Sequence, residues 1–311
     1  MRVFVTGASG WIGSAVVPDL IAGGHQVVGL ARSDASADAL TAAGVEVVRG
    51  DLADLDVLAA AAAAADGVIH LAFDHEVAFQ GGDFKAAADA DRASVEAMTR
   101  PLLGTDKTFV LTSGTPVAAG RVATEEDGHD VPPIGTVPPQ AAGPVTRMAT
   151  AEYVRALAGR GVRSSVVRLP RTNYGEGDKG FVASLVGTAR AQGVAGYYGD
   201  GTNRWPAVHR LDSARMFRLA LEKAPAGATL HAVSDEGVAL RDIAEVIGRH
   251  LDVPTAAVAP EEAAEHFGWL TPILAADQPA SSALSRELTG WEPVEPGLLD
   301  DLDKGHYFRE A

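Results

Sequence analysis

A glycine-rich turn near the N-terminus is the part of the sequence best equipped for chemistry. The segment Thr6–Gly13 follows an apolar strand expected at 2–6 and opens a helix expected at 12–22. In such a turn one glycine permits a tight bend, a second lets the backbone approach a pyrophosphate, and a third lets helix and strand pack closely. The helix N-terminus adds unpaired N–H groups and a partial positive charge. The pattern therefore predicts a dinucleotide site formed by Gly7, Ser9, Gly10, Trp11, Ile12 and Gly13.

The end of the second expected strand indicates which dinucleotide would bind. An NAD site usually has Asp or Glu there, roughly 20 residues after the glycines, to hold the ribose 2′-hydroxyl. Here Ala31 occupies that position, and Arg32 and Ser33 follow it. A guanidinium binds phosphate well and would suit a 2′-phosphate, so the pattern favours NADP(H) over NAD(H). In the alternative, Arg32 is a solvated loop residue and Asp34 holds the ribose.

The surrounding elements predict a parallel sheet that would position this turn. Apolar strands expected at 2–6, 25–31, 45–49, 67–71 and 108–112 alternate with helices expected at 12–22, 35–43, 55–64 and 83–100. After a long loop at Pro116–Pro144, a helix at 147–159 and a strand at 163–169 continue the pattern. We predict an α/β fold, a doubly wound parallel Rossmann sheet with a smaller C-terminal substrate lobe. The dinucleotide-binding domain would cover residues 1–172 and also about 206–235, and 173–311 would form mainly the substrate lobe.

Further expected elements lie towards the C-terminus. Helices are expected at 181–191, 212–223, 240–250, 260–267 and 298–308, and a strand at 230–233.

Composition excludes several classes of protein. The 311 residues include 26 basic and 41 acidic side chains, for a net charge of −15, which disfavours nucleic acid and anionic membranes as partners. The absence of cysteine excludes disulfides, thiol catalysis and Cys-ligated zinc, and no His-Glu-x-x-His motif indicates a metal site. No signal peptide or membrane-spanning run is visible. We expect a cytoplasmic protein that acts on a small molecule.

Four later motifs carry a family resemblance: Gly50-Asp51-Leu52, His70-Leu71-Ala72-Phe73, Leu111-Thr112-Ser113-Gly114 and Val167-Arg168-Leu169-Pro170. Together with the glycine turn they resemble the extended short-chain dehydrogenase/reductase family, which includes the NAD-dependent epimerases and dehydratases. The resemblance implies that Asp51 and Leu52 lie near the adenine. It also implies that Leu71, Ala72 and Phe73 pass the ribose, that Pro170 lies beside the nicotinamide, and that Ser113 is the active-site serine. A homodimer is a further expectation from the resemblance.

One family feature is missing from the sequence. Family members carry a Tyr, three residues, then a Lys; the Tyr is the general acid/base and the Lys holds the ribose. The corresponding stretch here is Gly143-Pro144-Val145-Thr146-Arg147-Met148. One alignment places Arg147 at the Lys position and Gly143 at the Tyr position, and a one-residue gap would place Met148 and Pro144 there. Either way the phenol is absent, so the chain resembles an atypical subgroup.

Other residues must then do the chemistry. Ser113 would hydrogen-bond a substrate carbonyl, and Arg147 would hold the ribose and stabilise a developing oxyanion. His75 or water would deliver the proton, because loops after parallel strands line the ligand crevice. His209 and His129 are weaker candidates, and Tyr174 is expected to be structural. The acidic cluster Glu125–Asp127 is expected to be a solvated loop.

We predict hydride transfer between NADPH and a carbonyl, imine or activated alkene. One alternative is an epimerase, dehydratase or isomerase that retains its cofactor. Another is a non-catalytic NADP(H) sensor or scaffold, a reading that the missing Tyr supports.

Overall fold

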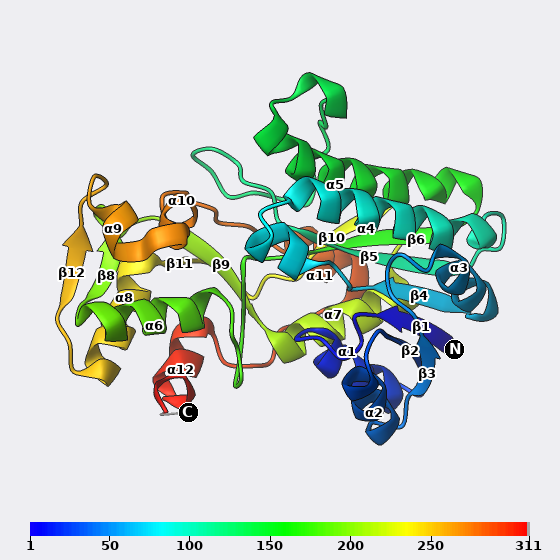
Figure 1. Cartoon of the computed structure of the whole chain (residues 1–311), viewed down its shortest axis with the longest axis horizontal. Coiled ribbons are helices and arrows are strands. Elements are labelled where there is room, and N and C mark those ends of the chain that lie inside the picture. Colours follow the sequence, from blue (N-terminus) through cyan, green and yellow to red (C-terminus); the bar gives the residue numbers. More distant parts are fainter. Residues whose placement is uncertain (310–311) are drawn as a thin grey trace.

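The computed structural model describes residues 1–309, and its larger part is a sheet of seven parallel strands in the order β10-β6-β5-β4-β1-β2-β3 (Figure 1). The strand order reverses between β1 and β4, as in a doubly wound sheet. The predicted fold class is therefore confirmed. The strands are β1 (Arg2–Thr6), β2 (Gln26–Ala31), β3 (Glu46–Arg49), β4 (Gly67–His70), β5 (Thr108–Gly114), β6 (Arg163–Leu169) and β10 (Ala228–His231).

Helices cover both faces of this sheet. On one face α1 (Gly13–Ala22) packs against α7 (Arg210–Lys223), and α2 (Asp34–Ala42) lies against β2 and β3. On the other face α4 (Phe84–Thr99) lies between α3 (Leu55–Ala64) and α5 (Pro139–Ala156). Because both faces are buried, the central strands are nearly continuous apolar runs such as Val3-Phe4-Val5.

A smaller lobe has its own hydrophobic core, which includes Trp205, Ile243 and Phe267. It contains two small sheets, β11-β9-β7 and β12-β8, and in Figure 1 it lies to the left of the large sheet. Strand β9 leads directly into α7 and so joins the lobe to the large sheet. The strands are β7 (Thr172–Tyr174), β8 (Ala195–Tyr198), β9 (Arg204–His209), β11 (Asp235–Ala239) and β12 (Thr255–Val258).

The remaining helices follow the two lobes. Those of the smaller lobe are α6 (Phe181–Gln192), α8 (Leu240–Leu251), α9 (Ala263–Phe267), α10 (Thr271–Leu274) and α12 (Leu298–Asp303), whereas α11 (Ala283–Thr289) packs on α7 and β10. Short helical turns are η1 (Glu76–Gln80), η2 (Arg100–Leu102), η3 (Ile134–Thr136), η4 (Leu157–Arg160), η5 (Gly268–Leu270) and η6 (His306–Phe308).

Helix α5 begins at Pro139 and not at residue 147, so the predicted long loop ends earlier than expected. Proline suits the first helical turn, where its missing N–H is not needed. Pro144 removes the N–H that would bond the carbonyl of Gln140, but Gln140 is exposed and water can satisfy that carbonyl. The longer helix places Gly143 and Arg147 on one helix face, four residues apart.

Two predicted C-terminal helices are shorter than expected. The helix expected at 260–267 begins only at Ala263, and the one expected at 298–308 stops at Asp303. Gly305, with a φ of +83°, separates α12 from the turn η6. The left-handed conformation that glycine adopts there ends the helix.

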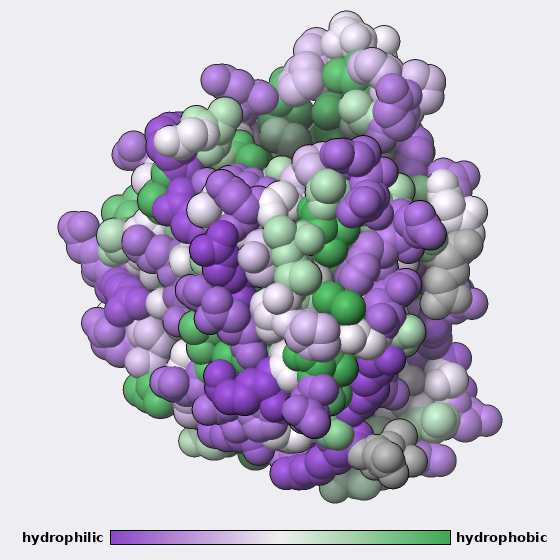
Figure 2. Space-filling model, turned by 90° about the vertical axis from the view of Figure 1, so that its left-hand side faces the viewer, coloured by the Kyte–Doolittle hydropathy of each residue, from purple (hydrophilic) through white to green (hydrophobic). Residues whose placement is uncertain are grey.

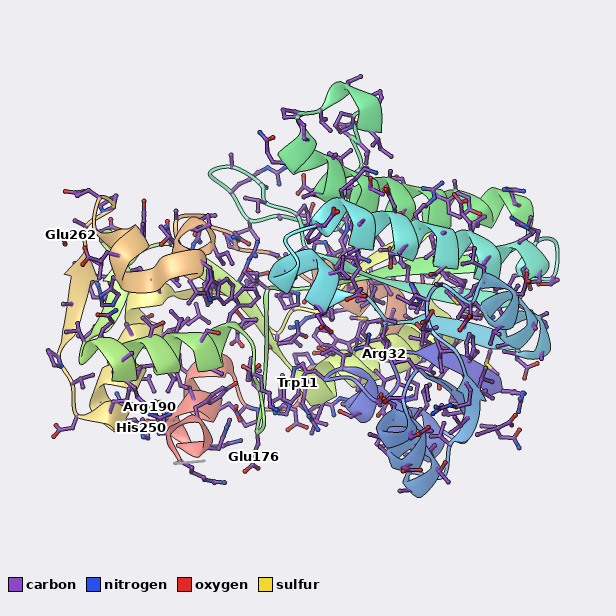
Figure 3. All side chains as sticks on the ribbon, viewed as in Figure 1. Trp11, Arg32, Glu176, Arg190, His250 and Glu262 are labelled. Atoms are coloured by element: carbon purple, nitrogen blue, oxygen red, sulfur yellow. The ribbon has the colours of Figure 1, made fainter. Side chains whose placement is uncertain are left out.

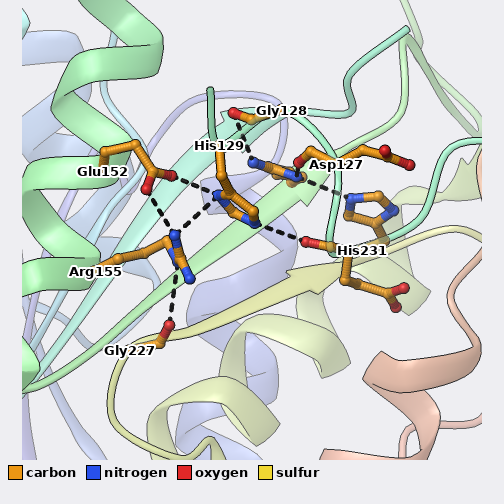
Figure 4. A network of polar contacts seen from close by, with 9 residues as sticks. Asp127, Gly128, His129, Glu152, Arg155, Gly227 and His231 are labelled. Carbon is orange, nitrogen blue, oxygen red and sulfur yellow. Dashed lines mark hydrogen bonds and ion pairs between the residues drawn. The ribbon is translucent and has the colours of Figure 1, made fainter. Parts of the chain in front are cut away.

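Buried polar contacts fix the long loop to the large sheet (Figure 4). Glu125 is only 3% exposed and accepts hydrogen bonds from the backbone N–H and hydroxyl of Ser285, so the expectation of a solvated acidic loop is wrong for this residue. Arg168 donates to the carbonyl of Asp127 at 2.6 Å. Burial lowers the pKa of His231, beside Arg168, to about 4 and keeps its ring neutral.

His129 belongs to the same network. Its Nδ1 lies 2.6 Å from Oε1 of Glu152, and its Nε2 lies 3.0 Å from the carbonyl oxygen of Glu125. Arg155 bonds the same Glu152 carboxylate at 2.6 Å. His129 therefore anchors the loop to α5, and its ring nitrogens are engaged there.

Candidate cofactor and substrate site

The glycine turn lies so close to other backbone that side chains would not fit. Gly7 has a φ of +68°, and a Cβ on it would lie 2.8 Å from the backbone nitrogen of Ala72, just after β4. A Cβ on Gly13 would lie 2.7 Å from the carbonyl carbon of Ala8. The N–H of Gly10 donates to the carbonyl of Gly7 at 3.0 Å and closes the bend. This bare backbone at the start of α1 fits a dinucleotide pyrophosphate.

Trp11 joins the turn to the smaller lobe. Its indole Nε1 donates to the carbonyl of Asn173 in β7 at 3.1 Å, and the guanidinium of Arg210 lies 4.4 Å from its ring centre. Figure 3 shows Trp11 between the two lobes. The turn is therefore held from both sides.

Two guanidinium groups lie at the carboxyl ends of β2 and β3. Arg32 is exposed directly after β2 (Figure 3), and Ser33 caps α2 by accepting from the N–H of Ser36 at 3.2 Å. Arg49 is in register with Ala31 and bonds the carboxylate of Asp34 at 2.7 Å. Sequence reasoning missed Arg49, although its place at the end of the third strand was a usable signal. Asp34 is thus paired with Arg49, and Arg32 is the exposed cation directly after β2.

The other predicted cofactor residues lie at the same edge of the sheet. Asp51 accepts a hydrogen bond from the N–H of Ala53 at 2.7 Å, and Leu52 follows it. Residues 71–73 follow β4, and Pro170 follows β6, where its carbonyl accepts from the Asn173 amide at 2.8 Å. The carboxyl ends of parallel strands form the ligand crevice in such sheets. The individual contacts of these residues with a cofactor stay predictions.

A chain of buried hydrogen bonds runs from the glycine turn to Arg147. The N–H of Ala72 donates to Oγ1 of Thr6 at 3.3 Å, and Thr6 Oγ1 lies 2.6 Å from Nδ1 of His70. Nε2 of His70 lies 3.2 Å from Oδ1 of Asp91, which is 2.9 Å from Nη1 of Arg147. With the His70 proton on Nε2, each donor faces an acceptor.

Asp91 is the ionised centre of this chain. Burial would raise the pKa of its carboxyl, but the hydrogen bond from His70 and the positive charge of Arg147 outweigh burial and hold the pKa below its usual range. Sequence reasoning missed both His70 and Asp91. A usable signal was a carboxylate on the apolar face of α4, beside buried residues such as Ala87, Ala88 and Val95.

Arg147 itself is held by three groups. Besides the Asp91 carboxylate, Nη2 donates to the carbonyl of Thr112 at 3.2 Å, and the guanidinium carbon lies 4.3 Å from the ring centre of Phe73. Ser113 is the next residue after Thr112 at the end of β5. Arg147 is therefore fixed at the sheet edge near Phe73 and the backbone of Ser113.

His75 belongs to an aromatic cluster next to Arg147. Its ring centre lies 5.2 Å from that of Phe73 and 5.8 Å from that of Phe79. Burial of part of the ring, together with the positive charge of Arg147, lowers the pKa of His75. The structure thus brings Arg147, Phe73 and His75 into one cluster.

The remaining sequence candidates have structural contacts. His209 is nearly buried and caps α7, because its Nδ1 accepts from the N–H of Leu211 at 3.3 Å. Tyr174 is fully buried and donates to the carbonyl of Pro296 at 2.7 Å, and burial raises the pKa of its phenol. Tyr174 is thus structural, as expected, and Trp205 is a core residue.

Residues 1–309 contain neither a metal-binding cluster nor a membrane-spanning helix. They contain no cluster of three or more side chains suited to hold a metal ion. Within the same described range, no helix has the length and apolar character needed to cross a bilayer.

The parallel sheet with its glycine turn defines a Rossmann protein of the extended short-chain dehydrogenase/reductase type. The model of the NAD dependent epimerase/dehydratase family matches residues 3–233, and the chain belongs to that family. The resemblance inferred from the motifs is therefore confirmed.

Three known proteins illustrate the likeness. An uncharacterised protein of Schizosaccharomyces pombe is 44% identical over 310 residues, which is 99% of this chain and 100% of that one. The "2-alkyl-3-oxoalkanoate reductase" of Stenotrophomonas maltophilia is 31% identical over 231 residues, 73% of this chain and 67% of the relative. The structure of a dTDP-glucose 4,6-dehydratase from Streptomyces venezuelae with NAD bound has a TM-score of 0.76 at 21% identity, and the match covers 100% of this chain and 97% of that one.

At Gly143, α5 packs so closely against α4 that a side chain would not fit without a shift. A Cβ on Gly143 would lie 2.7 Å from Cδ1 of Phe84 and 3.0 Å from the backbone nitrogen of Lys85. Alanine favours a helix by roughly 1 kcal/mol over glycine, but forced overlap costs roughly 1–3 kcal/mol. We expect Gly143→Ala to lower the free energy of unfolding in urea by about 1 kcal/mol.

The matched control is Gly135→Ala, since a Cβ at Gly135 would meet nothing within 4 Å. It should leave the free energy of unfolding nearly unchanged. An unchanged or higher stability of Gly143→Ala would show that α4 and α5 leave room for a side chain at this position.

Proposed function

We propose that this chain is an NADP(H)-dependent reductase of a small carbonyl compound. The observation that carries the proposal is the fixed guanidinium of Arg147, which the buried Asp91 carboxylate holds at the same sheet edge as the glycine turn. A relative named as an oxoalkanoate reductase, 31% identical, supports carbonyl reduction.

The residues of the site have distinct roles in this proposal. The glycine turn would hold the pyrophosphate, and the bound nicotinamide would supply a hydride to the carbonyl carbon while the carbonyl oxygen takes a proton. A guanidinium can stabilise a developing alkoxide but is a poor proton donor, and this is the role proposed for Arg147. Ser113 would orient the carbonyl by a hydrogen bond.

His75 is the proposed proton source, with water as its rival. The lowered pKa means that the imidazolium form of His75 is populated only in acidic solution. Its aromatic neighbours keep one side of the ring away from water. If His75 supplies the proton, the reaction is therefore faster at acidic pH.

The role of Arg147 is tested by Arg147→Lys, which keeps the charge but loses the planar fork that Asp91 and the Thr112 carbonyl fix. We expect kcat, measured as loss of NADPH absorbance, to fall by about tenfold to a hundredfold. The control is Arg92→Lys, because Arg92 also pairs with a carboxylate and lies 4.4 Å from an aromatic ring centre, that of Tyr153. Equal kcat values for Arg147→Lys and Arg92→Lys would show that Arg147 has no specific role in the reaction.

The role of His75 is tested by the pH dependence of kcat. For a group whose protonated form reacts, kcat declines as pH rises through its pKa, which here lies below the ordinary value of 6.5. We expect His75→Gln to have a lower kcat in acid and to lose this decline. Parallel pH profiles for the variant and the wild type would assign the proton to water.

Cofactor preference is tested at Arg32 and Arg49. A charge-assisted hydrogen bond to a 2′-phosphate raises affinity by about tenfold. Arg32→Ala and Arg49→Ala should therefore each weaken NADPH binding by about that factor. NADH binding should change little, because NADH lacks the phosphate. Fluorescence titration measures both, and Arg190→Ala in the smaller lobe is the control (Figure 3). Equal wild-type affinity for NADH and NADPH would contradict the proposed preference.

A broad panel of carbonyl compounds decides between an enzyme and a sensor. Tight binding of NADPH without oxidation of it by any compound would favour the non-catalytic sensor. Retention of the cofactor through purification, with turnover but no net NADPH consumption, would favour an epimerase or dehydratase.

A further inference from the structure

Arg171 lies where the two lobes join. It follows Pro170 at the carboxyl end of β6 and precedes β7 of the smaller lobe. Its Nε donates to Oε1 of Gln278 at 3.1 Å, and its guanidinium carbon lies 5.6 Å from the ring centre of Phe181, the first residue of α6. Two elements of the smaller lobe therefore hold a cation that starts from the edge of the large sheet.

Gln278, which bonds Arg171, is held by backbone hydrogen bonds at and next to it. The N–H of Gln278 donates to the carbonyl of Arg204 at 3.0 Å, and the next residue, Pro279, accepts from the N–H of Ala123 at 2.8 Å. Ala123 belongs to the long loop that the buried network anchors. Gln278 is thus tied to both lobes, and the direction of the guanidinium is preset.

Most half-buried arginines in the part of the chain that the structure describes pair with a carboxylate, whereas Arg163, Arg171 and Arg210 do not. Arg147, Arg215 and Arg218 each pair with a carboxylate, those of Asp91, Asp212 and Asp19. Arg168 instead bonds backbone carbonyls.

No carboxylate among residues 1–309 pairs with Arg171, and within that range its two terminal nitrogens make no hydrogen bond. Burial lowers the pKa of Arg171, and no acidic group opposes this effect. A guanidinium stays charged when partly buried, and the two terminal nitrogens of Arg171 are left free to bond an anion.

Apolar surface surrounds this cation. Phe181 also contacts Trp269, whose side chain is 61% exposed, with 5.8 Å between the ring centres. Figure 2 shows the face at this end of the molecule, where apolar residues lie among polar ones. A free aromatic side chain next to an unpaired cation suits a ligand with an apolar body and an anionic end.

We propose that Arg171 binds the carboxylate of the substrate, so that the preferred substrates are oxo acids. This inference rests on the proposed carbonyl reduction and adds the chemical class of the substrate. Two terminal N–H groups in a fixed plane match the two oxygens of a carboxylate. Arg171 directly follows Pro170, which is predicted to lie beside the nicotinamide, so the carboxylate would be anchored next to the reacting carbonyl.

The test compares acids with their uncharged esters. Benzoylformate, acetoacetate and levulinate are each titrated beside their methyl esters into the protein saturated with NADP⁺, by calorimetry. We expect at least one acid to bind about tenfold or more tightly than its ester, the ratio that a charge-assisted pair supplies. NADPH oxidation by the same pairs gives an independent second readout.

Variants connect the preference to this side chain. Arg171→Gln should abolish the acid-over-ester ratio without loss of NADPH binding, and Arg171→Lys should keep part of it. The control is Arg163→Gln at the opposite end of β6, where Arg163 bonds only the carbonyl of Leu221. It should keep the wild-type ratio.

The outcomes separate this inference from the proposed reductase. Equal binding of acid and ester, including no detectable binding of either for every pair, overturns the carboxylate site. An unchanged ratio in Arg171→Gln also overturns it. An acid preference in binding that depends on Arg171, with no NADPH oxidation, supports the site but contradicts carbonyl reduction.

Discussion

The candidate site depends on one buried carboxylate. Asp91 lies on the buried face of α4 and is 1% exposed, and among residues 1–309 His70 and Arg147 are the partners that compensate its charge. Removing either partner would leave an uncompensated charge in the interior, which is strongly unfavourable. This requirement fixes Arg147 at the sheet edge, and through His70 and Thr6 it fixes the same edge relative to the glycine turn.

The ion pair between Asp91 and Arg147 joins α4 to α5, the helix that lacks the family's Tyr. Gly143, one of the two residues that alignment places at the family's Tyr position, lies against Phe84 of α4. One turn further along α5, Arg147 pairs with Asp91 of α4. This stretch of α5 has no phenol that could donate a proton, and the guanidinium of Arg147 supplies only positive charge. In the proposed reductase, the proton would therefore have to come from another group.

Most of the large sheet could be predicted from the sequence because its strands are apolar on both faces and its turns contain glycine. Strands β1 and β6 begin and end at the predicted residues. The start of α5 could not be predicted, because Pro139 and Pro144 are typical of loops. Pro144 is tolerated in the helix because the carbonyl of Gln140 that it leaves unbonded is exposed to water, which the sequence does not show. The short strands of the smaller lobe are set by packing against α6 and α8, and their few residues carry little pattern of their own.

The polar side chains of the site show the same division. The glycine turn is recognisable from local spacing alone, because each of its glycines lies close to backbone atoms that would clash with a side chain. Asp91 and Gln278 owe their roles to partners far away in the chain, Arg147 and Arg171, and no local pattern connects them. The Glu125 contact with Ser285 is likewise formed only after the C-terminal segment folds back on the long loop.

A chain with a net charge of −15 can still attract anions, because screening makes charge a local property. At an ionic strength of about 0.1 M, charges separated by more than roughly 10 Å scarcely interact in water. Arg32 and Arg49 lie together at one end of the crevice edge, and Arg147 and Arg171 lie near its other strands. Asp34 and Asp91 pair with Arg49 and Arg147, whereas Arg32 and Arg171 have no carboxylate partner among residues 1–309. The acidic surface elsewhere would discourage adventitious binding of polyanions and leave this edge to small ones.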